Sequence, residues 1–390
     1  MPGDSSFPPA VPVTSGPGHH FFGYYDKTPW DATGRYILAL ETGFADRPPE
    51  PDDVAAVGLI DTENDCAWQP LTQTTAWNWQ QGAMLQWLPG ASDRLIVYNC
   101  LHKGHFAGVI RHAFRDEERL LPRPVYALSP DGRTAFSTNF ARIADTRPGY
   151  GYVGLADPWK DDPHPEDDGI YWMDIEKGEH RLIISLARIA ACRPDGSMES
   201  AKHWFNHVQV NTDGSRFAFL HRWRKPEEPH WRTRLFTADP DGSDVHCVAD
   251  HEMVSHYDWR RPDHILAWAR QHDIGDGYFL FTDRSDGRKV LGKGTLTKDG
   301  HCSYSPDRRW ILTDEAPDSE HKGTLLLYRP DDGERVDIGR FFSPLQLAGE
   351  IRCDLHPRWS RDGRQICFDS AHEGGRQVYV MDVGQIVAEA

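Results

Sequence analysis

Three histidines recur at one position relative to a tight turn. His207, His301 and His356 each stand six residues ahead of a turn aspartate, and His256 stands seven residues ahead of one. The aspartates are, in the same order, Asp213, Asp307, Asp362 and Asp263. Imidazoles act as general acids and bases or as ligands of divalent metals. A single histidine before a turn is usually solvated or hydrogen-bonded, but three in one phase and a fourth close to it favour a shared site.

Three of these histidines, together with a nearby aspartate, suit a metal ion. Asp354 and His356 are two residues apart, so they face the same side of an extended strand. Together with His256 and His301 they form a set of imidazoles and a carboxylate, which suits zinc or manganese, with calcium as a further candidate. Cys353 joins the set if the strand is irregular. The residues therefore predict a divalent-metal site, and the alternative is a ring of hydrogen-bonded polar side chains.

Two loops carry residues suited to proton transfer. NCLHKGHF holds His102 and His105, and RPGYGY holds Arg147, Tyr150 and Tyr152. A tyrosine or histidine can take and return a proton while cations hold an anionic substrate. Proton removal beside a carboxylate requires that its charge be neutralised as the carbanion develops. These groups are the minimum that a uronate lyase needs, whereas the structural alternative for RPGYGY is a rigid loop covering the fold.

The elements that must position these residues are repeated. Seven segments each contain a Pro/Asp/Gly-type turn followed by a β-branched or aromatic run, which is typical of a hairpin. A second strand pair follows, as in RLFTADPDGSDVHCVA. Seven four-stranded units predict an all-β fold, a seven-bladed β-propeller, rather than a tandem of β-sandwiches. The segments are 30–41, 88–99, 128–139, 210–221, 259–270, 304–315 and 359–370.

The propeller is expected to form one domain over residues 1–390, with segment 1–22 closing the ring because the last blade lacks a strand. In such a fold the inner strands line a channel, and their first residues meet the last residues of the second strands on one face. Lys27 takes the histidine position in the first blade. The residues at the ends of the second strands are polar: Glu41, Asn99, Asn139, His221, Arg222, Arg270, Asp314 and Glu315.

Composition and charge disfavour two kinds of partner and indicate a cellular location. The formal charge is −16 and no long basic run interrupts it, which disfavours nucleic acid and anionic membranes as partners. Neither a secretory leader nor an apolar stretch long enough to span a membrane is evident. Seven cysteines without a CxxC pair indicate reduced thiols. We therefore expect a cytoplasmic protein, or a periplasmic or secreted one if a leader has been removed.

The chain resembles the β-propeller polysaccharide lyases, namely the oligogalacturonate, ulvan and rhamnosyl-glucuronate lyases. The resemblance is carried by DLHPRWSRDGRQICFDS, HCSYSPDRRWILTDE, FNHVQV and GHHFFGYYDKTPW, with RPGYGY and the loop at 99–105 the more specific parts. It implies β-elimination at C4 of a uronic acid after deprotonation at C5, often with a divalent metal. The expected partner is a uronate-containing oligo- or polysaccharide.

The resemblance also implies roles for single residues. Tyr150 is the expected base and acid, with Tyr152 as its rival and His102 or His105 assisting. The inner-strand histidine and aspartate group is expected to hold the metal. The residues expected to bind the substrate and neutralise its carboxylate are Asn99, Arg147, His207, His221, Arg222 and Tyr25.

Two other functions fit the same pattern. A non-catalytic propeller of the TolB type would bind a protein or glycan through the same rim. A glycoside hydrolase would need two carboxylates facing each other across a cleft, which Glu41 and Glu315 could supply.

Overall fold

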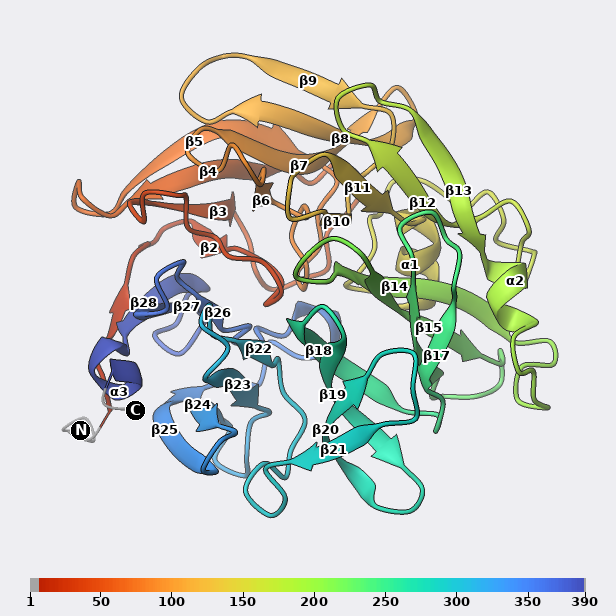
Figure 1. Cartoon of the computed structure of the whole chain (residues 1–390). Helices are drawn as coiled ribbons and strands as arrows, with labels where there is room; N and C mark the ends of the chain where they lie inside the picture. The colour runs from red at the N-terminus through yellow and green to blue at the C-terminus, as the bar shows by residue number, and fades with distance from the viewer. Residues whose placement is uncertain (1–6, 389–390) are drawn as a thin grey trace.

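The computed structural model describes residues 7–388 and contains seven four-stranded antiparallel sheets arranged in a ring (Figure 1). This confirms the predicted seven-bladed β-propeller. Residues 1–6 and 389–390 of the expected domain, and so the first part of the expected closing segment 1–22, lie outside the described residues.

The blades are numbered in chain order, and their strands are given from the channel outward. Blades 1 to 3 are β2 (His19–Phe21), β3 (Tyr36–Thr42), β4 (Ala55–Asp61) and β5 (Ala67–Thr74); β6 (Gln86–Trp87), β7 (Leu95–His102), β8 (His105–His112) and β9 (Glu118–Leu121); and β10 (Ala127–Leu128), β11 (Thr134–Ser137), β12 (Gly169–Asp174) and β13 (His180–Ser185). Blades 4 and 5 are β14 (Lys202–Val210), β15 (Phe217–Arg224), β16 (Arg232–Ala238) and β17 (His246–Ala249); and β18 (Val254–Arg261), β19 (His264–Gln271), β20 (Gly275–Thr282) and β21 (Arg288–Leu291). Blades 6 and 7 are β22 (Ser303–Tyr304), β23 (Ile311–Glu315), β24 (Lys322–Arg329) and β25 (Glu334–Phe342); and β26 (Arg358–Trp359), β27 (Gln365–Ser370), β28 (Gln377–Asp382) and β1 (Ala10–Pro12).

The ring is closed by the N-terminal strand β1, which is the outer strand of blade 7. It pairs antiparallel with β28, with Ala10 opposite Met381 and Pro12 opposite Tyr379. Just beyond β1, the Thr14 hydroxyl donates to Oε1 of Gln377 at 2.6 Å. The two ends of the chain therefore complete one sheet together, and every blade has four strands.

A repeated hydrogen-bond pattern sets the phase of the inner hairpins. In blade 7 the Ser360 hydroxyl donates to the Asp362 carboxylate at 2.6 Å and accepts from the backbone N–H of Gln365 at 2.9 Å. The same contacts recur at 129–134 and 305–310. Serine and aspartate side chains that bond to nearby backbone groups stabilise such turns, so the local sequence favours the hairpin in these three blades.

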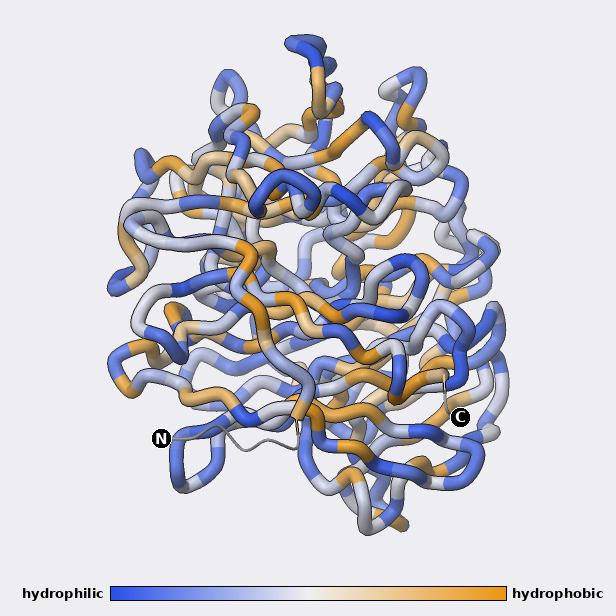
Figure 2. Tube along the Cα trace, turned by 90° about the vertical axis from the view of Figure 1, so that its left-hand side faces the viewer, coloured by the Kyte–Doolittle hydropathy of each residue, from blue (hydrophilic) through white to orange (hydrophobic). Residues whose placement is uncertain are grey.

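Hydrophobic clusters between neighbouring blades form the core. Both faces of a blade are covered by its neighbours. In the second strand β3, for example, Ile37 to Leu40 are all buried although they alternate between the two faces of the sheet. A sheet covered on both faces carries a continuous apolar run rather than an alternating one. Figure 2 accordingly shows hydrophobic segments along the strands, whereas the loops that project at the rims are largely hydrophilic.

The inner strands are irregular where they carry the residues of interest. After β2 the chain leaves the sheet until Trp30 bridges to Ile37, and the intervening segment places buried Tyr24 and Tyr25 in the channel. The ladders of β14 and β18 shift register at 206–209 and 254–257. Such bulges re-aim side chains, and these two lie where His207 and His256 turn toward the channel.

Helical segments are few and short. They are α1 (Phe140–Thr146), α2 (Leu186–Ala190), α3 (Gly384–Ala388) and the 3-10 turn η1 (Gly349–Ile351). Asn139 caps α1 by accepting from the N–H of Arg142 at 3.0 Å, and the loop with Arg147 and Tyr150 follows α1 directly. Within residues 7–388, no helix combines the length and the apolar character needed to cross a membrane.

Candidate active site

A cavity of about 300 Å³ opens where the inner strands of blades 5 to 7 begin. Its walls bring together the RPGYGY loop, the histidine segments and the segment that precedes β26. The polar residues that line it include Arg147, Tyr150, His256, Asp299, His301, Asp314, Arg352 and Asp354. Residues from three blades and two long connections thus converge on one space.

Tyr150 is held between two arginines in this cavity. Its side chain is 2% exposed, and its hydroxyl accepts a hydrogen bond from Nη2 of Arg352 at 2.8 Å. The guanidinium carbon of Arg147 lies 3.9 Å from the centre of the phenol ring. Burial alone would raise the pKa of Tyr150, but Arg147 and Arg352 outweigh that effect, so the pKa lies below its ordinary value. The arrangement favours the phenolate, which is the form that can take a proton.

Arg352 connects Tyr150 to the neighbouring carboxylate. Its Nε donates to Oδ2 of Asp354 at 2.7 Å while Nη2 contacts Tyr150. Sequence reasoning missed Arg352 as a site residue. The signal available was its position two residues ahead of Asp354 in the segment RCDLHP, because alternate residues of an extended segment project to one side.

His301, Asp354 and His356 form a candidate metal site. One ligand atom from each lies within 4.8 Å of the others. Nε2 of His356 is buried without a hydrogen-bond partner. Burial also holds the pKa of His356 well below its ordinary value, which keeps the neutral imidazole that a metal requires. An orphaned imidazole nitrogen beside a second imidazole and a carboxylate fits manganese or zinc.

Asp314 orients His301 within this group. Nδ1 of His301 lies 2.9 Å from both carboxylate oxygens of Asp314, which leaves Nε2 as the ring nitrogen available to a metal. A carboxylate behind a ligating histidine is the usual way to fix its tautomer and orientation. Burial lowers the pKa of His301, but the Asp314 carboxylate more than offsets this and raises the pKa to about 9. A metal that binds Nε2 at neutral pH therefore has to displace a proton from it.

The other inner-strand histidines surround the two channel tyrosines. The His256 ring centre lies 4.2 Å from that of His301, and its Nδ1 is 3.0 Å from Oδ1 of Asp299. His256 therefore lies beside the three-residue metal group rather than within it. His207 is buried deeper, with Nε2 at 3.0 Å from the Tyr25 hydroxyl. His256 lines the cavity that holds Tyr150, whereas His207 and Tyr25 do not.

Backbone geometry aims two of these histidines. His207 and His356 adopt φ values of +58° and +41°, in the left-handed region that residues other than glycine rarely occupy. Strained backbone of this kind is retained where surrounding contacts hold it, often at functional sites. The shared phase in the sequence therefore corresponds to a shared, unusual conformation in blades 4 and 7.

Asn99 and Tyr152 contact each other away from the cavity. Nδ2 of Asn99 donates to the Tyr152 hydroxyl at 2.9 Å and to the backbone oxygen of Val125 at 2.8 Å. The Tyr152 ring stacks on Phe140 at 4.3 Å between ring centres, and burial raises its pKa. Of the two tyrosines in RPGYGY, the structure brings Tyr150 to the cavity and packs Tyr152 into the core.

The remaining predicted residues lie further out. His102 and His105 pair at the end of the β7–β8 hairpin, and His105 lines a separate cavity of about 240 Å³. His221 is buried, with Nε2 at 2.8 Å from Nδ1 of His203. Arg222 is also buried, and its guanidinium carbon lies 5.6 Å from the centre of the Trp231 ring. None of these four predicted residues lines the cavity with Tyr150.

Glu41 and Glu315 belong to different surroundings. Glu315 lines the cavity, but it accepts from Arg335 at 2.8 Å and pairs with Lys298 at 3.0 Å. Glu41 accepts from the indole N–H of Trp68 at 2.9 Å in blade 1 and does not line the cavity. The structure does not bring these two carboxylates together across it.

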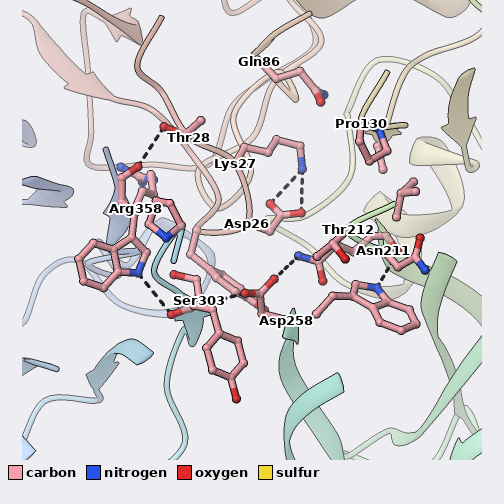
Figure 3. Close-up of a pocket in the computed structure, with 18 of the residues that line it drawn as sticks. Asp26, Lys27, Thr28, Gln86, Pro130, Asn211, Thr212, Asp258, Ser303 and Arg358 are labelled. Carbon is pink, nitrogen blue, oxygen red and sulfur yellow. Dashed lines mark hydrogen bonds and ion pairs between the residues drawn. The ribbon is translucent and has the colours of Figure 1, made fainter. Parts of the chain in front are cut away.

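The opposite mouth of the channel holds a larger cavity of about 470 Å³ (Figure 3). Several of its charged groups are hydrogen-bonded to other groups of the protein. Lys27 binds the Asp26 carboxylate at 2.9 Å, and Asp258 accepts from Gln209 at 2.9 Å and from the N–H of Tyr304 at 2.7 Å. The smaller cavity, where Tyr150 lies between two arginines and His301 and Asp354 of the candidate metal site line the wall, is therefore the better candidate for chemistry.

No protein-family model and no curated protein sequence matches the chain. Solved structures do. An oligogalacturonate lyase from Vibrio parahaemolyticus is 13% identical, with a TM-score of 0.68 over 98% of this chain and 95% of the lyase. An oligogalacturonate lyase in complex with manganese is 15% identical, with a TM-score of 0.71 over 99% of this chain and 96% of the lyase.

A puromycin-hydrolyzing peptidase from Mycobacterium tuberculosis is also similar, at 14% identity and a TM-score of 0.56 over 91% of this chain and 51% of the peptidase. Lyases and a peptidase thus share this architecture. Identities this low show the propeller fold, and the activity has to be argued from the site.

Proposed function

We propose that the protein is a polysaccharide lyase that cleaves a uronate-containing glycan by β-elimination. One observation carries the proposal: the phenol of Tyr150 is buried between Arg147 and Arg352, which lower its pKa. A tyrosine whose phenolate is stabilised by fixed cations is suited to removing a proton next to a carboxylate. The likeness to two oligogalacturonate lyases over nearly the whole chain supports the same class.

The reaction assigns a role to each group. The Tyr150 phenolate takes the C5 proton of the uronate, and the C5–H electrons form the C4=C5 double bond as the C4–O bond breaks. The resulting phenol then gives its proton to the departing glycosidic oxygen, which restores the phenolate. Arg147 faces the Tyr150 ring and is the candidate to hold the uronate carboxylate, while Arg352 keeps the hydroxyl in place.

A divalent metal fits His301, Asp354 and His356, whose ligand atoms lie within 4.8 Å of one another. When bound, such an ion supplies positive charge that stabilises the carboxylate as the carbanion develops. Asp314 fixes the orientation of His301 through contacts of 2.9 Å.

The test is release of unsaturated product, followed by its ultraviolet absorbance. Purified protein with added manganese is incubated with polygalacturonate, ulvan and rhamnosyl-glucuronate polymers. We expect the absorbance to rise with one of them and to stay flat in Tyr150→Phe. Binding of a polymer without any product would instead favour a non-catalytic, TolB-like propeller, and neither binding nor product would refute both functions.

A further inference from the structure

A second hollow of about 390 Å³ adjoins the candidate active site. Arg147, Tyr150 and Arg352 line both, so the two spaces meet at the tyrosine. The part that belongs to the second hollow alone includes Arg224, Trp231 and Glu350. A ligand that reaches Tyr150 can therefore extend along this direction.

Trp231 provides an exposed aromatic surface in this hollow. It is 37% exposed and stands at the end of the connection from β15 to β16. Its ring packs against buried Trp204 at 6.5 Å between centres, in an edge-on arrangement that fixes its orientation. Aromatic side chains that keep one face open in a defined orientation are suited to stacking on a ligand ring at a small cost in conformational freedom.

Three arginines surround Trp231 without a balancing acid. Arg147 and Arg222 place their guanidinium carbons 4.9 and 5.6 Å from the Trp231 ring centre, and Arg224 lines the hollow. Among residues 7–388, none of the three forms an ion pair, and Glu350 is the one acidic residue that lines the hollow.

Two of these arginines carry buried donors without partners. Nε and Nη1 of Arg147, which lines the hollow, and of Arg222, which is 4% exposed and lies behind its wall, have no hydrogen-bond partner. Burying an unpaired charge is costly, so buried arginines are normally paired. Three other buried arginines are paired with carboxylates, namely Arg142–Asp157, Arg216–Asp283 and Arg358–Asp369. The buried Arg234 and Arg376 instead donate to backbone oxygens.

We propose that this hollow is a subsite for a second acidic sugar of the substrate, here called the Trp231 subsite. The sugar ring stacks on Trp231, Arg224 binds its carboxylate or sulfate group, and Arg147 and Arg222 add positive charge on the other sides of the indole. The identity of the ligand as a glycan rests on the proposed function. The consequence is a preference for oligomers of consecutive acidic sugars over single residues.

The test measures binding in a Tyr150→Phe background, which keeps the ring and prevents turnover. Calorimetry compares digalacturonate, tetragalacturonate and methyl-esterified tetragalacturonate, with a sulfated ulvan tetrasaccharide as a second anionic probe. We expect an acidic tetramer to bind about tenfold more tightly than the dimer, a gain that stacking and one charge contact can supply. The ester should lose that gain.

Adding Trp231→Ala or Arg224→Ala should remove the gain with length, whereas Trp231→Phe should retain most of it. Phe114→Ala and Arg115→Ala are matched controls, because both side chains are exposed in the distant β8–β9 turn. An unchanged gain in Trp231→Ala, an ester that binds equally well, or no binding of either acidic tetramer would overturn the subsite. If wild-type protein binds a tetramer through Trp231 but releases no unsaturated product, the subsite stands and the lyase function falls.

Discussion

The Tyr150 hydroxyl accepts a hydrogen bond from Nη2 of Arg352 at 2.8 Å, across a separation of 202 residues in the chain. Tyr150 lies in the connection between the second and third strands of blade 3, whereas Arg352 follows η1 and precedes blade 7. The propeller ring brings these connections together at one mouth of the channel. The contact matters because the phenol becomes a useful base only where fixed positive charge favours its ionised form.

Arg352→Ala should therefore reduce turnover far more than substrate binding. Removing one fixed donor from a reacting oxygen costs on the order of 100-fold in kcat in comparable cases, while KM should change less because Arg147 remains. Steady-state kinetics on the glycan that yields product measures both constants. Arg94→Ala is the control, since that side chain pairs with its neighbour Asp93 on the surface. Equal losses in the two variants would contradict the role given to Arg352.

The two tyrosines of RPGYGY should separate activity from stability. Tyr150→Phe removes the reacting hydroxyl and should lower kcat by at least about 100-fold, which is typical of lost acid–base catalysis. Tyr152→Phe should keep activity but leave Nδ2 of Asn99 with one partner fewer, lowering the free energy of unfolding by about 1 kcal/mol. Urea unfolding and product absorbance, measured on both variants, check the pair. The reverse outcome would make Tyr152 the base.

Metal binding should depend on three residues and not on their neighbour. Manganese at 100 times its dissociation constant should raise the free energy of unfolding by about 2.7 kcal/mol in the wild type. His356→Ala and Asp354→Asn should abolish that gain, since they remove members of the group. His256→Gln should retain it, because His256 is bonded to Asp299 outside the group. Elemental analysis of dialysed protein gives an independent reading, and metal retained by His356→Ala would contradict the assignment.

The sequence predicted the fold well because its determinants are local. Three of the inner hairpins contain a turn in which serine and aspartate side chains bond to backbone groups a few residues away, as at Ser360 and Asp362. The phase of His301 and His356 relative to these turns also follows from local sequence. Strand direction then carries both toward the channel, where their ring centres lie 4.2 Å apart.

The site beyond the histidines depends on long connections, whose paths the sequence does not specify. His105 has a suitable side chain and a plausible phase, but its hairpin carries it outward to another cavity. Tyr150 lines the cavity and Tyr152 packs in the core because Phe140 stacks on Tyr152. That packing depends on how α1 lies against blade 4. Arg352 stands in an irregular segment between blades, where its two-residue spacing from Asp354 is the one signal and no turn pattern supports it.

His203 should make the protein sensitive to mild acid. Burial, followed by smaller effects of nearby His164, Arg234 and Arg142, lowers the pKa of His203 from 6.5 to about 4, and only a backbone hydrogen bond opposes this. Above pH 6.5 the imidazole is neutral in both the folded and unfolded states. As the pH falls from 6.5 toward 4, the unfolded chain binds a proton that the folded protein does not. The free energy of unfolding should then decrease, by at most about 3 kcal/mol from this group.

Urea unfolding at a series of pH values between 7 and about 4 measures this slope, and His203→Gln is the variant that tests its origin. Glutamine cannot titrate, yet its amide can still reach toward His221, which lies 2.8 Å from His203 and whose pKa burial also lowers. The variant should lose stability at pH 7, but its free energy of unfolding should decrease less steeply as the pH falls. His180→Gln, an exposed substitution in β13, should leave the slope unchanged. If the free energy of unfolding of His203→Gln changes with pH as steeply as that of the wild type, other groups cause the acid sensitivity. That result would contradict the role of His203, because a group whose pKa differs between the folded and unfolded states must contribute to this slope.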